Sequence, residues 1–161
     1  MPSSILRTKM GLRIIQINAQ HKKNSCHLLI NELTHYDIAI IQEPYLSNYS
    51  KNIPSIPPDW IVASSGSGNE KALILGNLKT TNLFPLQHFS SDECAVAIAT
   101  VYHEKLSYKV AIVSIYGIHA DKTKALNFLD NHFTAIKNHR GVHYVPGRSR
   151  SRRRRSQSKS A

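Results

Sequence analysis

The chain has 161 residues and a formal net charge of +11, which predicts one domain with a buried core and favours an anionic partner. Its two cysteines, Cys26 and Cys94, are too few for a disulfide framework and lack metal-binding spacing, so we expect reduced thiols. No apolar run reaches the ~18 to 20 residues of a membrane span, and the N-terminus has no signal-peptide core. We therefore expect a soluble, intracellular protein with no membrane partner.

The positive charge is concentrated at the C-terminus. Seven of the 21 basic residues fall within residues 148–161, which contain no acidic residue. The rest of the chain carries 14 basic and 10 acidic residues, a mild excess that is compatible with a phosphate-rich partner without identifying one. The location of the charge is therefore more informative than its size.

The chain begins with a strand and a helix. After a polar segment, residues 1–11, the isoleucine-rich run Leu12–Ala19 predicts a strand in which Asn18 stands near the end. The following residues place apolar side chains at helical spacing, which predicts an amphipathic helix with its N-cap at Asn24 or Ser25.

A second strand follows and ends in a carboxylate. The run Asp37–Glu43 is apolar up to Gln42, and Pro44 prevents the strand from continuing. Strand, helix and strand predict a βαβ-like unit, or a strand pair bridged by a helix. Because both strands are almost continuously apolar, we expect both to be covered on both faces.

The middle of the chain predicts two hairpins. Three prolines make Ser47–Trp60 a loop. Strand-like runs separated by short polar turns then pair Trp60–Ser65 with Lys71–Leu78, and Cys94–His103 with Tyr108–Gly117.

A helix and a short strand complete the predicted domain. The helix covers residues 121–139, and the strand begins at Val142. The apolar face of this helix carries Ala125, Phe128, Leu129, Phe133 and Ile136.

From Pro146 onward the chain is basic and almost free of apolar residues. Residues 146–161 cannot bury enough surface to offset their ordering entropy, so we expect a disordered tail. Its composition suits a nuclear-localisation signal, an RNA-binding arm or a phosphorylatable switch, and equally a solvated tail with no selected role. The side chains that could neutralise nucleic-acid phosphates are Arg148, Arg150, Arg152, Arg153, Arg154 and Arg155.

Asn18 and Glu43 are the first candidates for chemistry, because they end two strands joined by one helix. If these strands are parallel neighbours, both side chains emerge at the carboxyl edge of the sheet, where α/β folds bind ligands. Their oxygens are hard ligands that suit Mg²⁺ and a phosphate. Because a buried unpaired carboxylate costs several kcal/mol, we expect a cationic group to face Glu43. The alternative is that both residues are polar strand ends in water.

Tyr116 ends a third strand in the same way. Its phenol could orient or protonate a phosphate oxygen, although a lone tyrosine at a strand end more often serves packing. Elsewhere the histidines show no metal-binding spacing, and Gly66–Gly68 lacks the Lys-Ser/Thr and helix of a phosphate-binding loop. No serine-hydrolase elbow is present either.

The order of these elements resembles the N-terminal part of the endonuclease/exonuclease/phosphatase family, and more closely the endonuclease domains encoded by non-LTR retrotransposons. The resemblance covers roughly Leu12–Val145. It is carried by Asn18, by Gln42-Glu43-Pro44 and by the Ser-x-Tyr that ends at Tyr116. It implies an α/β sandwich of two mixed sheets with helices outside and a site at one end, between the sheets.

The resemblance also implies roles for the strand-end residues. Glu43 would bind the catalytic Mg²⁺, or Mn²⁺ in its place; Asn18 would help to set the phosphate and metal environment, and Tyr116 would contact the scissile phosphate. The implied reaction is metal-dependent cleavage of a phosphodiester by an aligned water. DNA is the implied partner, RNA is an alternative partner of the tail, and the location would be intracellular or nuclear.

Two motifs of the family are missing from the sequence. Where Gly-Asp-x-Asn is expected, Val145 is followed by Pro146-Gly147-Arg148, and no Ser-Asp-His follows. Residues 12–145 would then be a truncated domain, incomplete at its C-terminal side, with an exposed sheet edge. Since catalytic groups that act as a unit fail together, three hypotheses stay open: a Mg-dependent endonuclease, a non-catalytic nucleic-acid-binding remnant acting through the Arg/Ser-rich tail, and a product without a stable fold.

Overall fold

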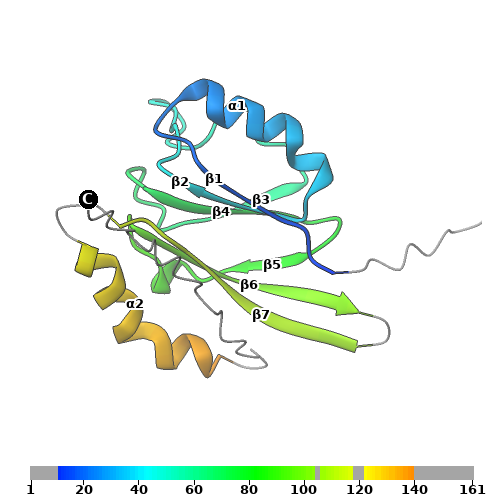
Figure 1. The fold of residues 1–161 in the computed structure, drawn as a ribbon, viewed down its shortest axis with the longest axis vertical. Helices are drawn as coiled ribbons and strands as arrows, with labels where there is room; N and C mark the ends of the chain where they lie inside the picture. The colour runs from blue at the N-terminus through cyan, green and yellow to red at the C-terminus, as the bar shows by residue number, and fades with distance from the viewer. Residues whose placement is uncertain (1–10, 104–105, 118–121, 140–161) are drawn as a thin grey trace, which may run out of the picture.

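In the computed structural model, which describes residues 11–103, 106–117 and 122–139, the chain forms two facing β-sheets with an α-helix outside each (Figure 1). The layers follow the order helix, sheet, sheet, helix, which is the predicted α/β sandwich. Residues 1–10, the strand predicted at Val142 and the basic tail with its six arginines lie outside the described residues.

The first sheet contains the predicted strand–helix–strand unit and the first predicted hairpin. Across the sheet its strands are β1 (Ile14–Asn18), β2 (Ile38–Gln42), β4 (Ala72–Asn77) and β3 (Trp60–Ala63). β1 and β2 are parallel, and the other neighbours are antiparallel. Between β1 and β2 the chain forms α1 (Lys23–Glu32) and the 3-10 helix η1 (Leu33–His35), which lie over the outer face.

The second sheet contains the other predicted hairpin and a strand that the sequence did not predict. Its antiparallel strands are β5 (Asn82–Pro85), β6 (Cys94–His103) and β7 (Leu106–Ile115). β5 was missed because it is only four residues long and ends in proline, which is tolerated there because the strand lies at an edge. A 3-10 helix, η2 (Gln87–Phe89), follows β5.

Three apolar layers hold these elements together. The first lies between α1 with η1 and the first sheet and includes Cys26, Leu29 and Leu33. The second lies between the sheets, where alanines of β6 meet isoleucines of β2 and β4. The third lies between β6 and the predicted C-terminal helix, α2 (Lys122–Lys137), which contributes Ile136. Burial of these side chains is the main term that favours the folded chain.

The prediction that both parallel strands are covered on both faces is correct for β2 and wrong for β1. Ile15 and Ile17 of β1 pack under α1, whereas Ile14 is 45% exposed and Asn18 is exposed. β1 is an edge strand of the described sheet, and the second sheet packs against β2, β3 and β4 instead. The sequence could not reveal this, because the burial of β1 depends on how far another sheet extends.

The two helices also differ in detail from the predictions. α1 begins at Lys23, and its N-cap residue is Lys22, whose side chain makes no capping hydrogen bond. The predicted N-cap at Asn24 or Ser25 is therefore wrong. In α2, Phe128 and Ile136 pack on the sheet as expected, but Phe133 is 37% exposed. The side chains of Ala125 and Leu129 lie outside the described part of the structure.

Both cysteines are buried and unpaired, as the sequence predicted. Burial raises the pKa of the Cys94 thiol to about 11, and burial likewise raises the pKa of Cys26. Among the described helices none is long and apolar enough to cross a membrane.

Candidate active site

The carboxyl ends of β1 and β2 lie side by side, as the sequence predicted. In the parallel pair Asn18 is in register with Gln42, so Asn18 and Glu43 are at the same edge of the sheet. Two backbone hydrogen bonds extend the pairing beyond the strands: the Ala19 N–H donates to the Gln42 carbonyl at 2.8 Å, and the His21 N–H donates to the Glu43 carbonyl at 2.8 Å.

Glu43 adopts an unusual backbone conformation that decides where its side chain goes. Strict alternation along β2 would place Glu43 on the α1 side, because Ile41 faces α1 and Ile40 faces the second sheet. Instead Glu43 has a φ of +47°, and its N–H donates to the Lys71 carbonyl at 2.8 Å. Its carboxylate reaches Tyr116, which directly follows β7 of the second sheet.

Tyr116 follows β7 directly and joins the two sheets at this end. Its hydroxyl donates a hydrogen bond to Oε1 of Glu43, and its N–H donates to the Glu93 carbonyl at 2.8 Å. The hydrogen bond to the Glu43 carboxylate is the main cause that raises the pKa of Tyr116, with smaller contributions from desolvation and from the charge of Glu43. Tyr116 also packs against the cluster between the sheets, so it serves both packing and polar contact.

Asn18 is exposed and is held by a local turn. Its Oδ1 accepts a hydrogen bond from the Gln20 N–H at 2.9 Å, and the chain then passes through two residues with positive φ, Gln20 at 51° and His21 at 54°. The amide NH₂ of Asn18 has no hydrogen-bond partner among the described residues. It is therefore a donor available to a ligand.

The expectation that a cation faces Glu43 is not met by the described residues. Lys71 contacts Glu43 through its backbone carbonyl, which accepts the Glu43 N–H, but its Nζ lies 3.9 Å from Oε1 of Glu93. The Tyr116 hydroxyl is the polar partner of Glu43 instead. Because Glu43 is only half-buried, water can solvate its second oxygen and the missing cation costs less than full burial would.

A second polar cluster at the same end of the sandwich was not foreseen. Ser65 Oγ donates to Asp92 Oδ1 at 3.1 Å and lies 3.5 Å from Glu70 Oε1, and Ser67 Oγ donates to Asp92 Oδ1 at 2.5 Å. From the sequence this segment was expected to be a hairpin turn that is not a phosphate-binding loop. The one available signal was a Ser/Gly-rich turn that is closed by a carboxylate, Glu70, directly before an apolar strand.

The donor set at Asn18 and Glu43 suits magnesium better than zinc. Among the described residues no three His, Cys, Asp or Glu side chains gather into a metal-binding group. Magnesium does not need such a cage, because it binds through one or two carboxylates and keeps waters or substrate phosphates as its other ligands. A half-buried carboxylate, one oxygen of which has no hydrogen-bond partner among the described residues, fits that pattern together with an exposed carboxamide at the same edge of the sheet.

Comparison with known proteins finds its matches among solved structures. No protein-family model and no curated protein matches the sequence. The endonuclease domain of TRAS1, a telomere-specific non-LTR retrotransposon, matches with a TM-score of 0.58 and 20% identity, over 82% of this chain and 56% of that one. A humanized D. rerio TDP2 with 14 mutations matches with a TM-score of 0.47 and 13% identity, over 76% of this chain and 56% of that one. The chain thus spans a little more than half the length of these structures.

Proposed function

We propose that this chain, whose fold is of the endonuclease/exonuclease/phosphatase type, is a divalent-metal-dependent phosphodiesterase domain that acts on DNA as an endonuclease. The observation that carries the proposal is the contact between the Glu43 carboxylate and the Tyr116 hydroxyl, at the end of the sandwich where Asn18 also lies. The likeness to the TRAS1 endonuclease domain supports it at the level of the fold.

Glu43 would hold the metal ion, Mg²⁺ or Mn²⁺, with Asn18 beside it. Tyr116 engages one oxygen of the Glu43 carboxylate and so fixes its orientation, while the other oxygen stays available. Asn18 Oδ1 has one lone pair in the turn to Gln20 and a second lone pair free for a ligand. When bound, the ion would neutralise charge that develops on a phosphodiester and would activate water.

The chain's own groups supply the hydrogen bonds that a phosphate needs. Tyr116 is protonated at neutral pH, because the ordinary pKa of a phenol is 10.0 and the pKa of Tyr116 is raised further, so its hydroxyl can turn from Glu43 and donate to a phosphate oxygen. The amide NH₂ of Asn18 offers a second donor at the same edge. Lys22 and Lys23, which are exposed where α1 begins just after Asn18, add favourable charge for an anionic substrate.

Nicking of supercoiled plasmid in the presence of Mg²⁺ tests this function. We expect Glu43→Gln to slow nicking by about 100-fold or more, and Tyr116→Phe to slow it by roughly 10- to 100-fold, the scale on which single groups in such sites act. The matched control is Glu32→Gln, an exposed carboxylate at the end of α1, which should nick like the parent. Nicking by Glu43→Gln at the parent rate would refute the proposal.

A second candidate function is favoured by the charge of residues 148–161. These residues carry seven basic and no acidic side chains, so the tail could bind nucleic acid, DNA or RNA, without catalysis, or direct the protein to the nucleus. Deletion of residues 148–161 would then abolish binding, and affinity would fall steeply with salt, while Glu43→Gln would bind normally. Binding that survives the deletion would exclude this second function.

A further inference from the structure

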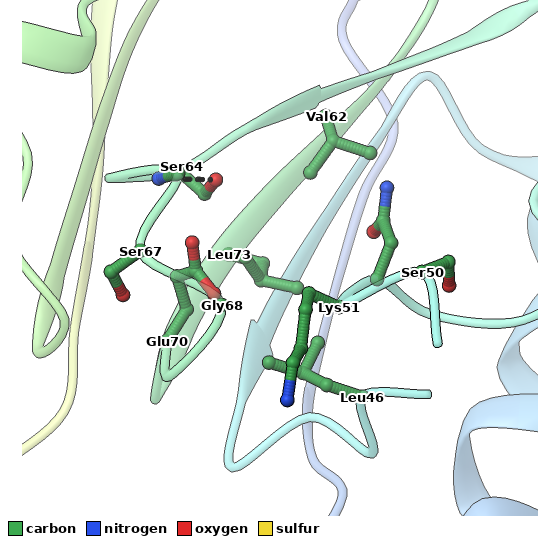
Figure 2. A pocket seen from close by; sticks show the side chains of 11 residues that line it. Leu46, Ser50, Lys51, Val62, Ser64, Ser67, Gly68, Glu70 and Leu73 are labelled. Atoms are coloured by element: carbon green, nitrogen blue, oxygen red, sulfur yellow. Dashed lines mark hydrogen bonds between the residues drawn. The ribbon is translucent and has the colours of Figure 1, made fainter. Parts of the chain in front are cut away.

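A pocket of about 370 Å³ opens at the same end of the sandwich as Glu43, beside the turn that joins β3 to β4 (Figure 2). Its volume lies at the small end of the range for ligand sites. Leu46, Val62 and Leu73 form an apolar wall, and the turn contributes Ser64 and Ser67.

Glu70 places an unsatisfied carboxylate oxygen at this pocket. The residue is only 4% exposed, and its Oε2 has no hydrogen-bond partner, while Oε1 has only the long contact of 3.5 Å with Ser65. Figure 2 shows the carboxylate among Ser67, Gly68 and Leu73 on one side of the pocket. A buried carboxylate oxygen without a donor is costly, so the site favours a ligand that brings N–H groups.

Lys51 supplies a positive charge at the rim of the same pocket. A Cβ on Gly68 would lie 3.0 Å from Cβ and 3.1 Å from Cγ of Lys51, so the lysine stem packs on the bare backbone of the turn. The Lys51 ammonium has no ion-pair or hydrogen-bond partner among the described residues, and the side chain is exposed. A cationic ligand would be repelled there, whereas a phosphate would be attracted.

Carboxylate, apolar wall and ammonium together fit a nucleotide, and the carboxylate selects the base. Guanine presents two adjacent donors, N1–H and the N2 amino group, on one edge, and these match the two oxygens of a carboxylate. Adenine and cytosine place a ring-nitrogen acceptor beside their amino group, and thymine and uracil flank their single N–H with two carbonyl oxygens. Each of these would set a lone pair against Glu70.

We propose that this pocket binds a guanine nucleotide, with the base edge on Glu70, the base face on Leu46, Val62 and Leu73, and the phosphate at Lys51. This deepens the proposed function, on which it rests, because it adds a base-specific subsite to the phosphodiester site. The backbone links the pocket to the proposed metal site, because the Glu43 N–H donates to the carbonyl of Lys71, the residue after Glu70. Val62 and Leu73 belong to the cluster under α1, whereas the Glu43 carboxylate turns toward Tyr116 between the sheets, so the pocket would read a guanine displaced from the scissile phosphate around the end of the first sheet.

Calorimetric titration of the full chain with GMP, AMP, CMP and UMP, without metal, tests the pocket apart from any cleavage. We expect GMP to bind more tightly than the other three by roughly 5- to 100-fold, the discrimination that one good bidentate contact provides. Glu70→Gln keeps the size of the side chain and should remove this preference, while Glu32→Gln should retain it. Equal affinity for the four nucleotides, or an unchanged preference in Glu70→Gln, would overturn the proposal and leave water as the partner of Oε2.

Lys51→Gln keeps the assay decisive if Glu70→Gln folds poorly, because Lys51 is exposed. This substitution should weaken the binding of GMP and of AMP by the same factor. The affinity for guanosine, which has no phosphate, should stay unchanged. Weakening of guanosine as well would contradict the placement of the phosphate. Guanine-specific binding by a chain that nicks no plasmid would support the guanine pocket and refute the nuclease function. Nicking by a chain without guanine preference would support the nuclease function and refute the guanine pocket.

Discussion

Three non-glycine residues adopt positive φ where β1 and β2 end, namely Gln20, His21 and Glu43. Each costs of order 1–3 kcal/mol and persists only where the surroundings hold it. Here the His21 N–H donates to the Glu43 carbonyl, and His21 Nδ1 lies 3.2 Å from the Pro44 carbonyl oxygen. The strain turns the Glu43 side chain away from α1 and toward Tyr116, which places the proposed metal ligand between the sheets.

The raised pKa of Tyr116 makes a prediction about alkaline pH. A neutral phenol is favoured in the folded chain, so its stabilising effect is complete below the ordinary phenol pKa of 10.0 and is lost as pH rises through the higher folded value. The difference in unfolding midpoint between the parent and Tyr116→Phe should therefore be constant from neutral pH to about 10 and shrink above it. Urea unfolding at a series of pH values measures this difference, and a difference that grows with alkaline pH would contradict the hydrogen bond to Glu43.

The sequence predicted that Asn18 and Glu43 lie at one edge of the sheet, but not how Glu43 meets Tyr116. The spacing of strand, helix and strand was enough to place Asn18 and Glu43 at one edge, because parallel strands share their carboxyl end. It could not predict the positive φ of Glu43, since nothing local favours that conformation for glutamate. It also missed Glu70, because the burial of a turn residue depends on segments far away in the chain.

At the scale of elements, β1 and β2 are also fastened at the end opposite to the site. Asp37 is fully buried directly before β2, and its carboxylate accepts hydrogen bonds from the backbone N–H of Arg13 at 2.9 Å and from its guanidinium at 3.3 Å. The Asp37 N–H donates in turn to the Arg13 carbonyl at 2.8 Å. The edge strand β1 thus depends on this pair as well as on its ladder with β2.

Asp37→Asn should lower the free energy of unfolding by about 2 to 4 kcal/mol, because it removes the countercharge of Arg13 and disturbs a buried hydrogen-bond set. The control is Asp59→Asn, which breaks an exposed ion pair with Lys79 and should cost less than about 1 kcal/mol. Chemical denaturation of the two variants gives both values. Equal losses would mean that burial of the Asp37 pair contributes nothing beyond a surface contact.

Strands were predicted correctly where the apolar runs are long, and one was missed where contacts with neighbouring strands decide whether a segment forms a strand. β2, β4, β6 and β7 are dense apolar runs, and each was predicted close to its observed bounds. β5 was missed because Asn82–Pro85 is short and half exposed. The close approach of the sheets there is equally invisible in the sequence: a Cβ on Gly76 would lie 2.6 Å from Cδ2 of Leu83.

At the scale of the whole molecule, the described part has strand edges that no other described strand covers. β1 pairs only with β2, and β7 pairs only with β6. Ile14 of β1 is 45% exposed on the face that the second sheet does not reach, and Leu106 of β7 is also exposed. Such edges, flanked by apolar side chains, are templates for pairing with another chain.

We therefore expect the purified chain to self-associate at micromolar concentration, with a mass by light scattering above the 18.1 kDa of one chain. Ile14→Lys should weaken this association by about tenfold, because it places a charge on the exposed edge and removes an apolar contact. Leu28→Lys, at an exposed position on α1 away from the edge, is the matched control and should associate like the parent. A monomer at all concentrations would show that these edges are covered.

The hydrogen bond between Glu43 and Tyr116 spans 73 positions of the chain and joins the two sheets. During synthesis the first sheet can be complete while the phenol that completes the polar pair is still inside the ribosome, since domains assemble as their segments emerge. A nascent polypeptide that ends before residue 116 would carry the carboxylate without its partner. For a protein proposed to cut DNA, the polar pair at the proposed site would therefore form only once the β6–β7 hairpin has closed.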